Sequence, residues 1–166
     1  MIIDTHTHFY DPGRPQGVPW PREDDRVLYR AVLPEHFRAL TEPLGIGGTV
    51  VVEASEWLED NQWILDLAEH EPLIVGFVGH IDPLDDCFAR SLDRFAANPL
   101  FRGIRARGIR LQALKEGLGL RNIQLLAARD LSLDILAGTE DLDDITELAA
   151  RLPNLRIIIN HVGQVT

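Results

Sequence analysis

Cysteine and lysine are nearly absent from this chain. Cys87 is the single cysteine, so an internal disulfide and a metal site built from several thiolates are both excluded. It lies in an amphipathic helical stretch, and we expect it to be buried in the core. Lys115 is the single lysine, so every other basic residue is an arginine.

Long apolar runs and positive charge are also scarce. No run approaches the roughly 18 residues of a membrane span, and the chain opens on a strand pattern rather than a basic leader, which predicts a cytoplasmic protein. With 26 acidic against 16 basic residues, the formal charge is −10. Such a surface repels nucleic acid and anionic membranes, so neither is an expected partner.

The first eight residues contain the most informative pattern. Asp4, His6 and His8 alternate with other residues after Ile2 and Ile3, and a strand places residues two apart on one face. Two neutral imidazoles at a strand end supply half of a divalent-metal site. The alternative is that both rings are only solvated.

Residues 9–32 are rich in proline and glycine, so neither a helix nor a central strand can persist there. A connection of this length is typical of a lid or a binding loop. Because it follows His8, we expect it to lie over the two imidazoles. Its aromatic side chains either form a wall of the site or hold the loop in place: Tyr10, Trp20 and Tyr29.

The remaining pattern alternates strands with helices. Strands are predicted to begin near residues 2, 49, 73, 101, 132 and 155, with a helix between each pair, one of them starting at Asp82 and Pro83. Strict alternation predicts a parallel sheet with right-handed crossovers. The polar residues fall at the carboxyl ends of these strands, where parallel α/β folds bind ligands: His6, His8, Glu53, His80, Asp82, Arg105, Arg107 and His161.

Two α/β architectures fit this alternation. A doubly wound sheet normally has a glycine-rich phosphate turn after its first strand, but this chain has His8, Phe9 and Tyr10 there. A closed barrel of eight units needs about 250 residues. We therefore predict a single domain over residues 1–166, an incomplete (β/α)8 barrel that ends after strand six.

The order of these motifs resembles the amidohydrolase superfamily, in the amidohydrolase-related branch that includes lactonases. The resemblance covers nearly the whole chain. It rests on the segments 4–8, 53–57, 60–63, 74–79, 101–105 and 160–163. It implies a (β/α)8 barrel that activates water for attack on an ester or amide carbonyl, with His6, His8 and His161 as catalytic and metal-binding residues.

The resemblance also limits the cofactor. Members with two metals bridge them by a modified lysine at the end of strand four, whereas Lys115 lies well beyond that strand and Arg105 and Arg107 occupy the matching region. We expect at most one divalent ion, zinc or manganese, with metal-independent catalysis as the alternative. The family's strand-eight aspartate has no counterpart here, so the chain is interpreted as a fragment or the product of a degraded gene.

Several residues are predicted to bind the substrate. The guanidinium groups of Arg105 and Arg107 suit a bidentate grip on a substrate carboxylate, or they pair with Glu53 or Asp134. Asp134 is expected to be buried in strand five, where a carboxylate must be paired. Asn160 is expected to be structural. The predicted substrate-binding residues are Glu53, His80, Arg105, Arg107 and Trp20.

Three functions remain open from the sequence. The first is hydrolysis of a lactone or cyclic ester of a small carboxylate-bearing or sugar-acid substrate. The second is metal-dependent, non-oxidative decarboxylation within the same superfamily, and the third is an inactive fragment or small-molecule binding module. Because strands one and six are apolar edges, the chain alone is expected to self-associate, as a homo-oligomer or an aggregate, and to lack lactonase activity.

Overall fold

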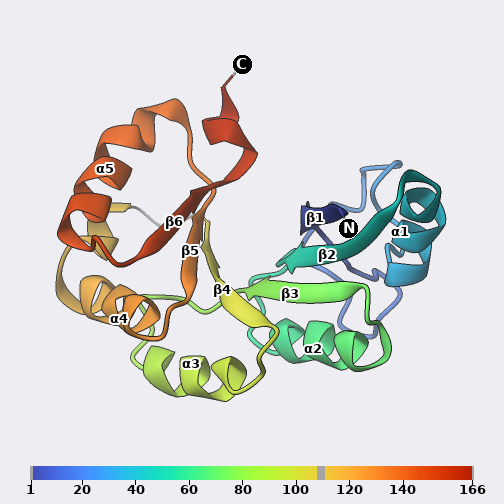
Figure 1. The fold of residues 1–166 in the computed structure, drawn as a ribbon, viewed down its shortest axis with the longest axis horizontal. Coiled ribbons are helices and arrows are strands. Elements are labelled where there is room, and N and C mark those ends of the chain that lie inside the picture. Colours follow the sequence, from blue (N-terminus) through green and yellow to red (C-terminus); the bar gives the residue numbers. More distant parts are fainter. Residues whose placement is uncertain (1, 108–110, 166) are drawn as a thin grey trace. The chain divides into compact units, whose positions relative to one another are not determined.

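The structure is a computed structural model that describes residues 2–107 and 111–165. All six predicted strands are present, at β1 (Ile2–Thr7), β2 (Ile46–Val52), β3 (Ile74–Gly79), β4 (Phe101–Ala106), β5 (Ser132–Ile135) and β6 (Arg156–Ile159). The helices between them are α1 (Pro34–Thr41), α2 (Asp60–His70), α3 (Phe88–Ala96), α4 (Gly117–Ala128) and α5 (Leu142–Arg151). The predicted alternation of strands and helices is confirmed (Figure 1).

The chain divides into two compact units, which are described separately. The first is Met1–Phe77 with Asn98–Leu100, and the second is Val78–Ala97 with Phe101–Thr166. The first unit contains β1, β2 and most of β3, in that order, and the second contains β4, β5 and β6 in that order. The β1–β2, β4–β5 and β5–β6 pairs are all parallel, as the helical connections require.

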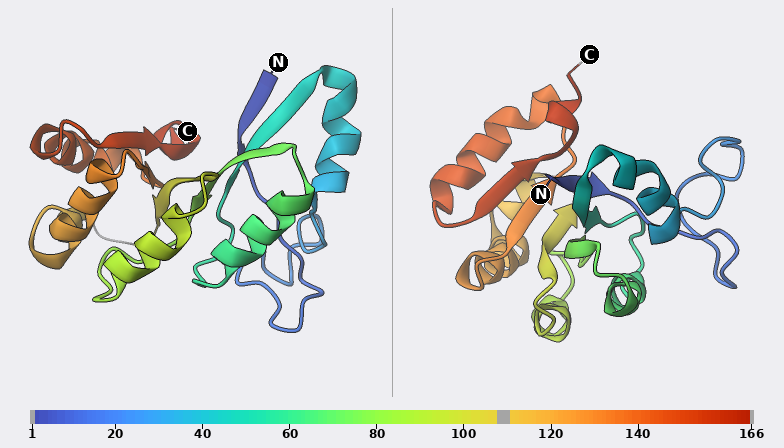
Figure 2. Two further views of the ribbon diagram at one scale, coloured as in Figure 1. Left: turned by 60° about the horizontal axis from the view of Figure 1, so that its bottom comes forward. Right: turned by 45° about the vertical axis from the view of Figure 1, so that its right-hand side comes forward.

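In the first unit, β-branched residues build the buried end of β2. Val51 and Val52 are 0% and 1% exposed in β2, and Ile64 and Leu65 of α2 are also buried. The connection from β1 to α1 (residues 8–33, the β1–α1 loop) leaves the carboxyl end of β1 (Figure 2). Its two ends are joined by Tyr10 and Val32, which exchange two backbone hydrogen bonds of 2.9 Å.

In the second unit, α3, α4 and α5 cover one face of the strands (Figures 1 and 2). Their inward residues are fully buried against the apolar strand residues, as 3.6-residue periodicity requires. The largest of them are Phe88, Leu92, Phe95, Ile123, Leu126 and Leu148.

The predicted start of the third helix is wrong. The Asp82 and Asp85 carboxylates accept hydrogen bonds from the backbone N–H groups of Leu84 and Cys87, at 2.8 and 2.7 Å. These turns compete with helix formation, so α3 begins only at Phe88. Cys87 therefore lies outside the helix and is exposed, not buried as expected.

No helix within the described residues is long and apolar enough to cross a membrane.

Candidate functional site

The two imidazoles of the first strand lie together, as their spacing predicts. The ring centroids of His6 and His8 are 5.0 Å apart and the rings are nearly perpendicular, at 86°. Asp4 precedes them on the same strand, and its Oδ1 atom accepts a hydrogen bond from the His6 backbone N–H at 3.0 Å. The carboxylate of Asp4 thus holds the backbone that carries the histidines.

The tautomer of His8 follows from its partner on the next strand. Its Nδ1 atom lies 2.8 Å from the carbonyl oxygen of Val52. A carbonyl can only accept, so Nδ1 carries the proton and Nε2 of the neutral ring has the lone pair. This is the arrangement in which a backbone carbonyl orients a metal-ligating histidine.

Aromatic residues of the β1–α1 loop lie beside His8. The Trp20 ring is 5.5 Å from the His8 ring and 5.3 Å from the Tyr10 ring, with edge-to-face geometry in both pairs. The Tyr10 hydroxyl donates to the Leu28 carbonyl at 3.1 Å, and burial raises the pKa of the phenol. The two aromatic roles considered from the sequence therefore divide: Tyr10 holds the loop, and Trp20 lies against the imidazole.

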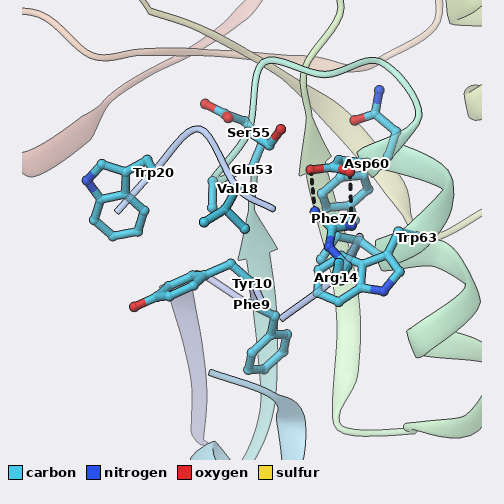
Figure 3. Close-up of a pocket in the computed structure, with 13 residues that line it drawn as sticks. Phe9, Tyr10, Arg14, Val18, Trp20, Glu53, Ser55, Asp60, Trp63 and Phe77 are labelled. Atoms are coloured by element: carbon cyan, nitrogen blue, oxygen red, sulfur yellow. Dashed lines mark hydrogen bonds and ion pairs between the residues drawn. The ribbon is translucent and has the colours of Figure 1, made fainter. Parts of the chain in front are cut away.

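A pocket extends from Trp20 toward α2 (Figure 3). Glu53 follows the end of β2, is 3% exposed and lines this pocket together with Ser55 and Trp20. The far side is formed by Arg14 of the loop and Asp60 of α2. Sequence reasoning missed both of these residues. The available signal was an arginine in a proline-rich loop together with an aspartate in the helical stretch that follows the second strand.

The other predicted polar residues belong to the second unit. His80 follows β3 and is half-buried, and Arg107 follows β4 and is also half-buried. Arg105 is 4% exposed within β4, and its guanidinium donates to Nε2 of His161 at 3.2 Å. Because a guanidinium has no acceptor atom, His161 uses its Nε2 lone pair in this contact.

Asp134 is buried in β5, as expected, and is 3% exposed. Its two carboxylate oxygens accept hydrogen bonds from the Ser132 hydroxyl at 3.2 Å and the Asn160 amide at 3.0 Å. Burial raises the pKa of Asp134, although these two hydrogen bonds and the charge of Arg105 act in the opposite direction. Asn160 thus has the structural role predicted for it.

Lys115 is engaged by two acidic residues of a helix. Its ammonium donates to Asp144 at 2.8 Å and to Glu147, both on α5. A lysine held in this way is not available as a bridging metal ligand. Within residues 2–107 and 111–165, no group of three or more histidine, cysteine, aspartate or glutamate side chains is arranged to hold a metal ion.

The predicted site residues therefore fall into two sets. His6, His8, Trp20 and Glu53 gather in the first unit, while His80, Arg105, Arg107 and His161 lie in the second. The convergence of the two sets on one substrate stays a prediction.

Comparison with known proteins identifies the family of the chain. The Amidohydrolase family model (Amidohydro_2) matches residues 3–166. An L-fucono-1,5-lactonase of Burkholderia ambifaria is 30% identical over 168 residues, covering 98% of this chain and 57% of the relative. The chain thus spans a little over half of that relative's length.

Solved structures share the fold. An amidohydrolase from Burkholderia multivorans superposes with a TM-score of 0.86 in a crystal with bound HEPES and 0.84 in one with bound Zn, at 24% and 25% identity. These matches cover 98% of this chain and 57% and 58% of theirs. A probable 2-pyrone-4,6-dicarboxylic acid hydrolase from Acinetobacter baumannii, with citric acid bound, has a TM-score of 0.75 at 18% identity and covers 99% and 59%.

These matches bear out the resemblance seen in the sequence and the prediction of an incomplete (β/α)8 barrel. The family model begins at the strand of the two histidines and extends past the last described element. The chain belongs to the amidohydrolase family.

Proposed function

We propose that the protein hydrolyses a lactone, by attack of water on the ring carbonyl of a sugar-acid or other small carboxylate-bearing substrate. One observation carries the proposal: the His6 and His8 imidazoles lie together at the end of β1, with Trp20 against His8, in a chain similar to an L-fucono-1,5-lactonase over 98% of its length. The similarity to a 2-pyrone-4,6-dicarboxylic acid hydrolase supports the same reaction class.

Two residues of the first unit offer half of a divalent-ion site. His8 is fixed in the tautomer with Nε2 as the acceptor, and His6 lies next to it, so we propose that these two histidines would hold one zinc or manganese ion. A bound ion would polarise the lactone carbonyl and lower the pKa of water. His161 stays a predicted third ligand, although its Nε2 atom is engaged by Arg105.

The protein side chains supply the rest of the proposed site. Trp20 gives an apolar surface for one face of the substrate ring. Glu53 is a buried carboxylate in the same pocket and would accept hydrogen bonds from substrate hydroxyls. Arg105 and Arg107 would bind a substrate carboxylate, with His80 as a further contact.

The test is a chimera in which this chain replaces the matching 57% of the B. ambifaria L-fucono-1,5-lactonase. We expect acid release from a sugar lactone, with His6→Ala and His8→Ala each lowering the rate by about 100-fold or more. His70→Ala is the matched control, because His70 is exposed at the end of α2. Carbon dioxide release would indicate the decarboxylase instead. A folded chimera with neither activity would indicate a binding module.

A further inference from the structure

The β1–α1 loop has a tertiary anchor besides its closed base. Both terminal nitrogens of Arg14 donate to the carboxylate of Asp60, Nη1 to Oδ1 at 3.0 Å and Nη2 to Oδ2 at 2.9 Å. The guanidinium also lies over the Trp63 ring, 4.2 Å from its centroid. Figure 3 shows these two contacts at the side of the pocket opposite Trp20.

This contact has the features of a strong ion pair. The side chains of Arg14 and Asp60 are only 10% and 13% exposed, and a bidentate guanidinium–carboxylate pair is both shorter and more directional than a single bond. Removing one partner of such a pair leaves a charge with little solvent around it. Asp60 is the first residue of α2, so the pair ties a loop without regular structure to a rigid helix.

Trp20 follows Arg14 by one short stretch of this loop. Gly17 lies between these two residues in the sequence, and its carbonyl accepts a hydrogen bond of 3.5 Å from the Arg14 guanidinium. The segment that leads to Trp20 is therefore held by Arg14 at its start. The backbone bonds between Tyr10 and Val32 hold the two ends of the loop. At this base the Tyr10 ring also lies 5.3 Å from the Trp20 ring.

We infer that Arg14 and Asp60 are positioning residues that hold Trp20 against His8 and thereby set substrate affinity. The inference rests on the proposed function, since it takes Trp20 and His8 as part of the substrate site. Arg14 acts through the loop and touches neither imidazole. Loss of the ion pair should therefore weaken substrate binding much more than it lowers the rate of the chemical step.

Three variants test the inference in the 166-residue chain: Asp60→Asn, Arg14→Gln and the two combined. Asp66→Asn is the matched control, because this residue lies on the same helix, is exposed and bonds only to Gln62 among the contacts of its side chain that the structure gives. Arg14→Lys keeps the positive charge but loses the planar guanidinium that donates two hydrogen bonds to Asp60. The loop readout is the rate of tryptic cleavage after Arg22, Arg26 and Arg30, all of which are exposed.

We expect each single variant to be cleaved about tenfold faster within the loop, as local opening becomes easier. The double variant should be no worse than either single one, because the two residues act as a pair. Arg14→Lys should fall between parent and Asp60→Asn, and Asp66→Asn should match the parent. Thermal unfolding followed by circular dichroism identifies any variant that has lost the whole fold. If Asp60→Asn or Arg14→Gln has done so, the cleavage rate of Arg14→Lys tests the inference instead.

The position of Trp20 has its own readout. Acrylamide quenching of Trp20 fluorescence, taken as the difference from the Trp20→Phe variant of each protein, should become about twofold more efficient without the ion pair. Unchanged quenching and unchanged cleavage in Asp60→Asn would overturn the inference. Additive effects of the two single variants would overturn the pairing.

Kinetics in the chimera separate this inference from the proposed function. Asp60→Asn should raise the KM for the lactone about tenfold with a small change in kcat, as loss of uniform binding predicts. A fall in kcat alone would overturn the role in substrate affinity. If the chimera hydrolyses no lactone, the proposed function fails, while the cleavage and quenching results still decide whether the pair positions Trp20.

Discussion

The Asn160 amide donates a hydrogen bond of 3.0 Å to the carboxylate of Asp134, and both side chains are 3% exposed. Asn160 directly follows β6 and Asp134 lies within β5, so this contact joins the ends of two neighbouring strands. The Oδ1 atom of Asn160 is buried and has no hydrogen-bond partner among the residues that the structure describes. A protonated Asp134 carries an O–H donor, whereas the ionised form carries none.

Asp134→Asn should therefore stabilise the protein near neutral pH. Burial raises the pKa of Asp134, so the folded state favours the neutral carboxyl. The stability that the neutral carboxyl contributes is complete below the unfolded pKa of about 3.9, and it is lost as pH rises through the folded pKa. An amide at this position stays neutral, and its NH2 group can donate to Asn160. We expect a gain of about 1 kcal/mol at pH 7 and little gain at pH 4.

Urea unfolding of parent and variant at several pH values between 4 and 7 measures this difference. The control is Asp86→Asn, which removes the same charge from an exposed position and should change stability by less than about 0.5 kcal/mol. A variant that becomes less stable than the parent as pH rises would contradict the explanation.

Gly103→Ala should damage the same region. Gly103 pairs with Ser132 across β4 and β5, and a Cβ atom at position 103 would lie 2.2 Å from the Ser132 hydroxyl oxygen and 2.3 Å from its carbonyl oxygen. The backbone of β5 would have to move, at a cost of about 3 kcal/mol. Gly13→Ala is the control, since its nearest neighbour is the flexible Asp11 side chain at 3.1 Å. Equal unfolding midpoints for the two variants would refute the steric argument.

Local sequence pattern predicted the strands and their polar ends well, because burial in a sheet selects β-branched runs such as the one in β2. It failed where short-range polar contacts compete with periodicity, as at Asp82 and Asp85.

The candidate site was predicted less completely. The histidine pair follows from a two-residue period, which acts within one strand. The ion pair of Arg14 and Asp60 joins residues 46 positions apart, and no local pattern specifies which acid a loop arginine will meet. The contact between Arg105 and His161 likewise joins residues far apart in the sequence, 56 positions, so no local pattern predicts it.

Zinc binding should be weak and limited to one ion per chain. His6 and His8 offer two ligands, and in the described ranges no third acidic, thiol or imidazole group joins them in a metal-binding cluster. Equilibrium dialysis with elemental analysis should find at most one Zn²⁺, with His8→Ala lowering its affinity at least about tenfold and His70→Ala leaving it unchanged. Two tightly held ions per chain would contradict this prediction.

The edge strands should make the 166-residue chain self-associate. Ile2 and Ile3 of β1 are 59% and 40% exposed, and Ile158 and Ile159 of β6 are 46% and 38% exposed. These strands are the first and last in the strand order of the sheet, so apolar side chains accompany backbone groups that another chain can pair with. Natural sheets discourage such pairing with charged residues on the edge.

Ile3→Lys should therefore lower self-association, because a second chain would have to bury the new charge or pair around it. Val27→Lys is the matched control: Val27 is 73% exposed but lies in the β1–α1 loop, away from any strand edge. Sedimentation velocity over about a hundredfold range of concentration should show association of the parent and of Val27→Lys, and a shift toward monomer for Ile3→Lys. If exposed apolar side chains in general caused the association, Ile3→Lys and Val27→Lys would lower it equally. A parent chain that stays monomeric at every concentration would exclude association through the strand edges.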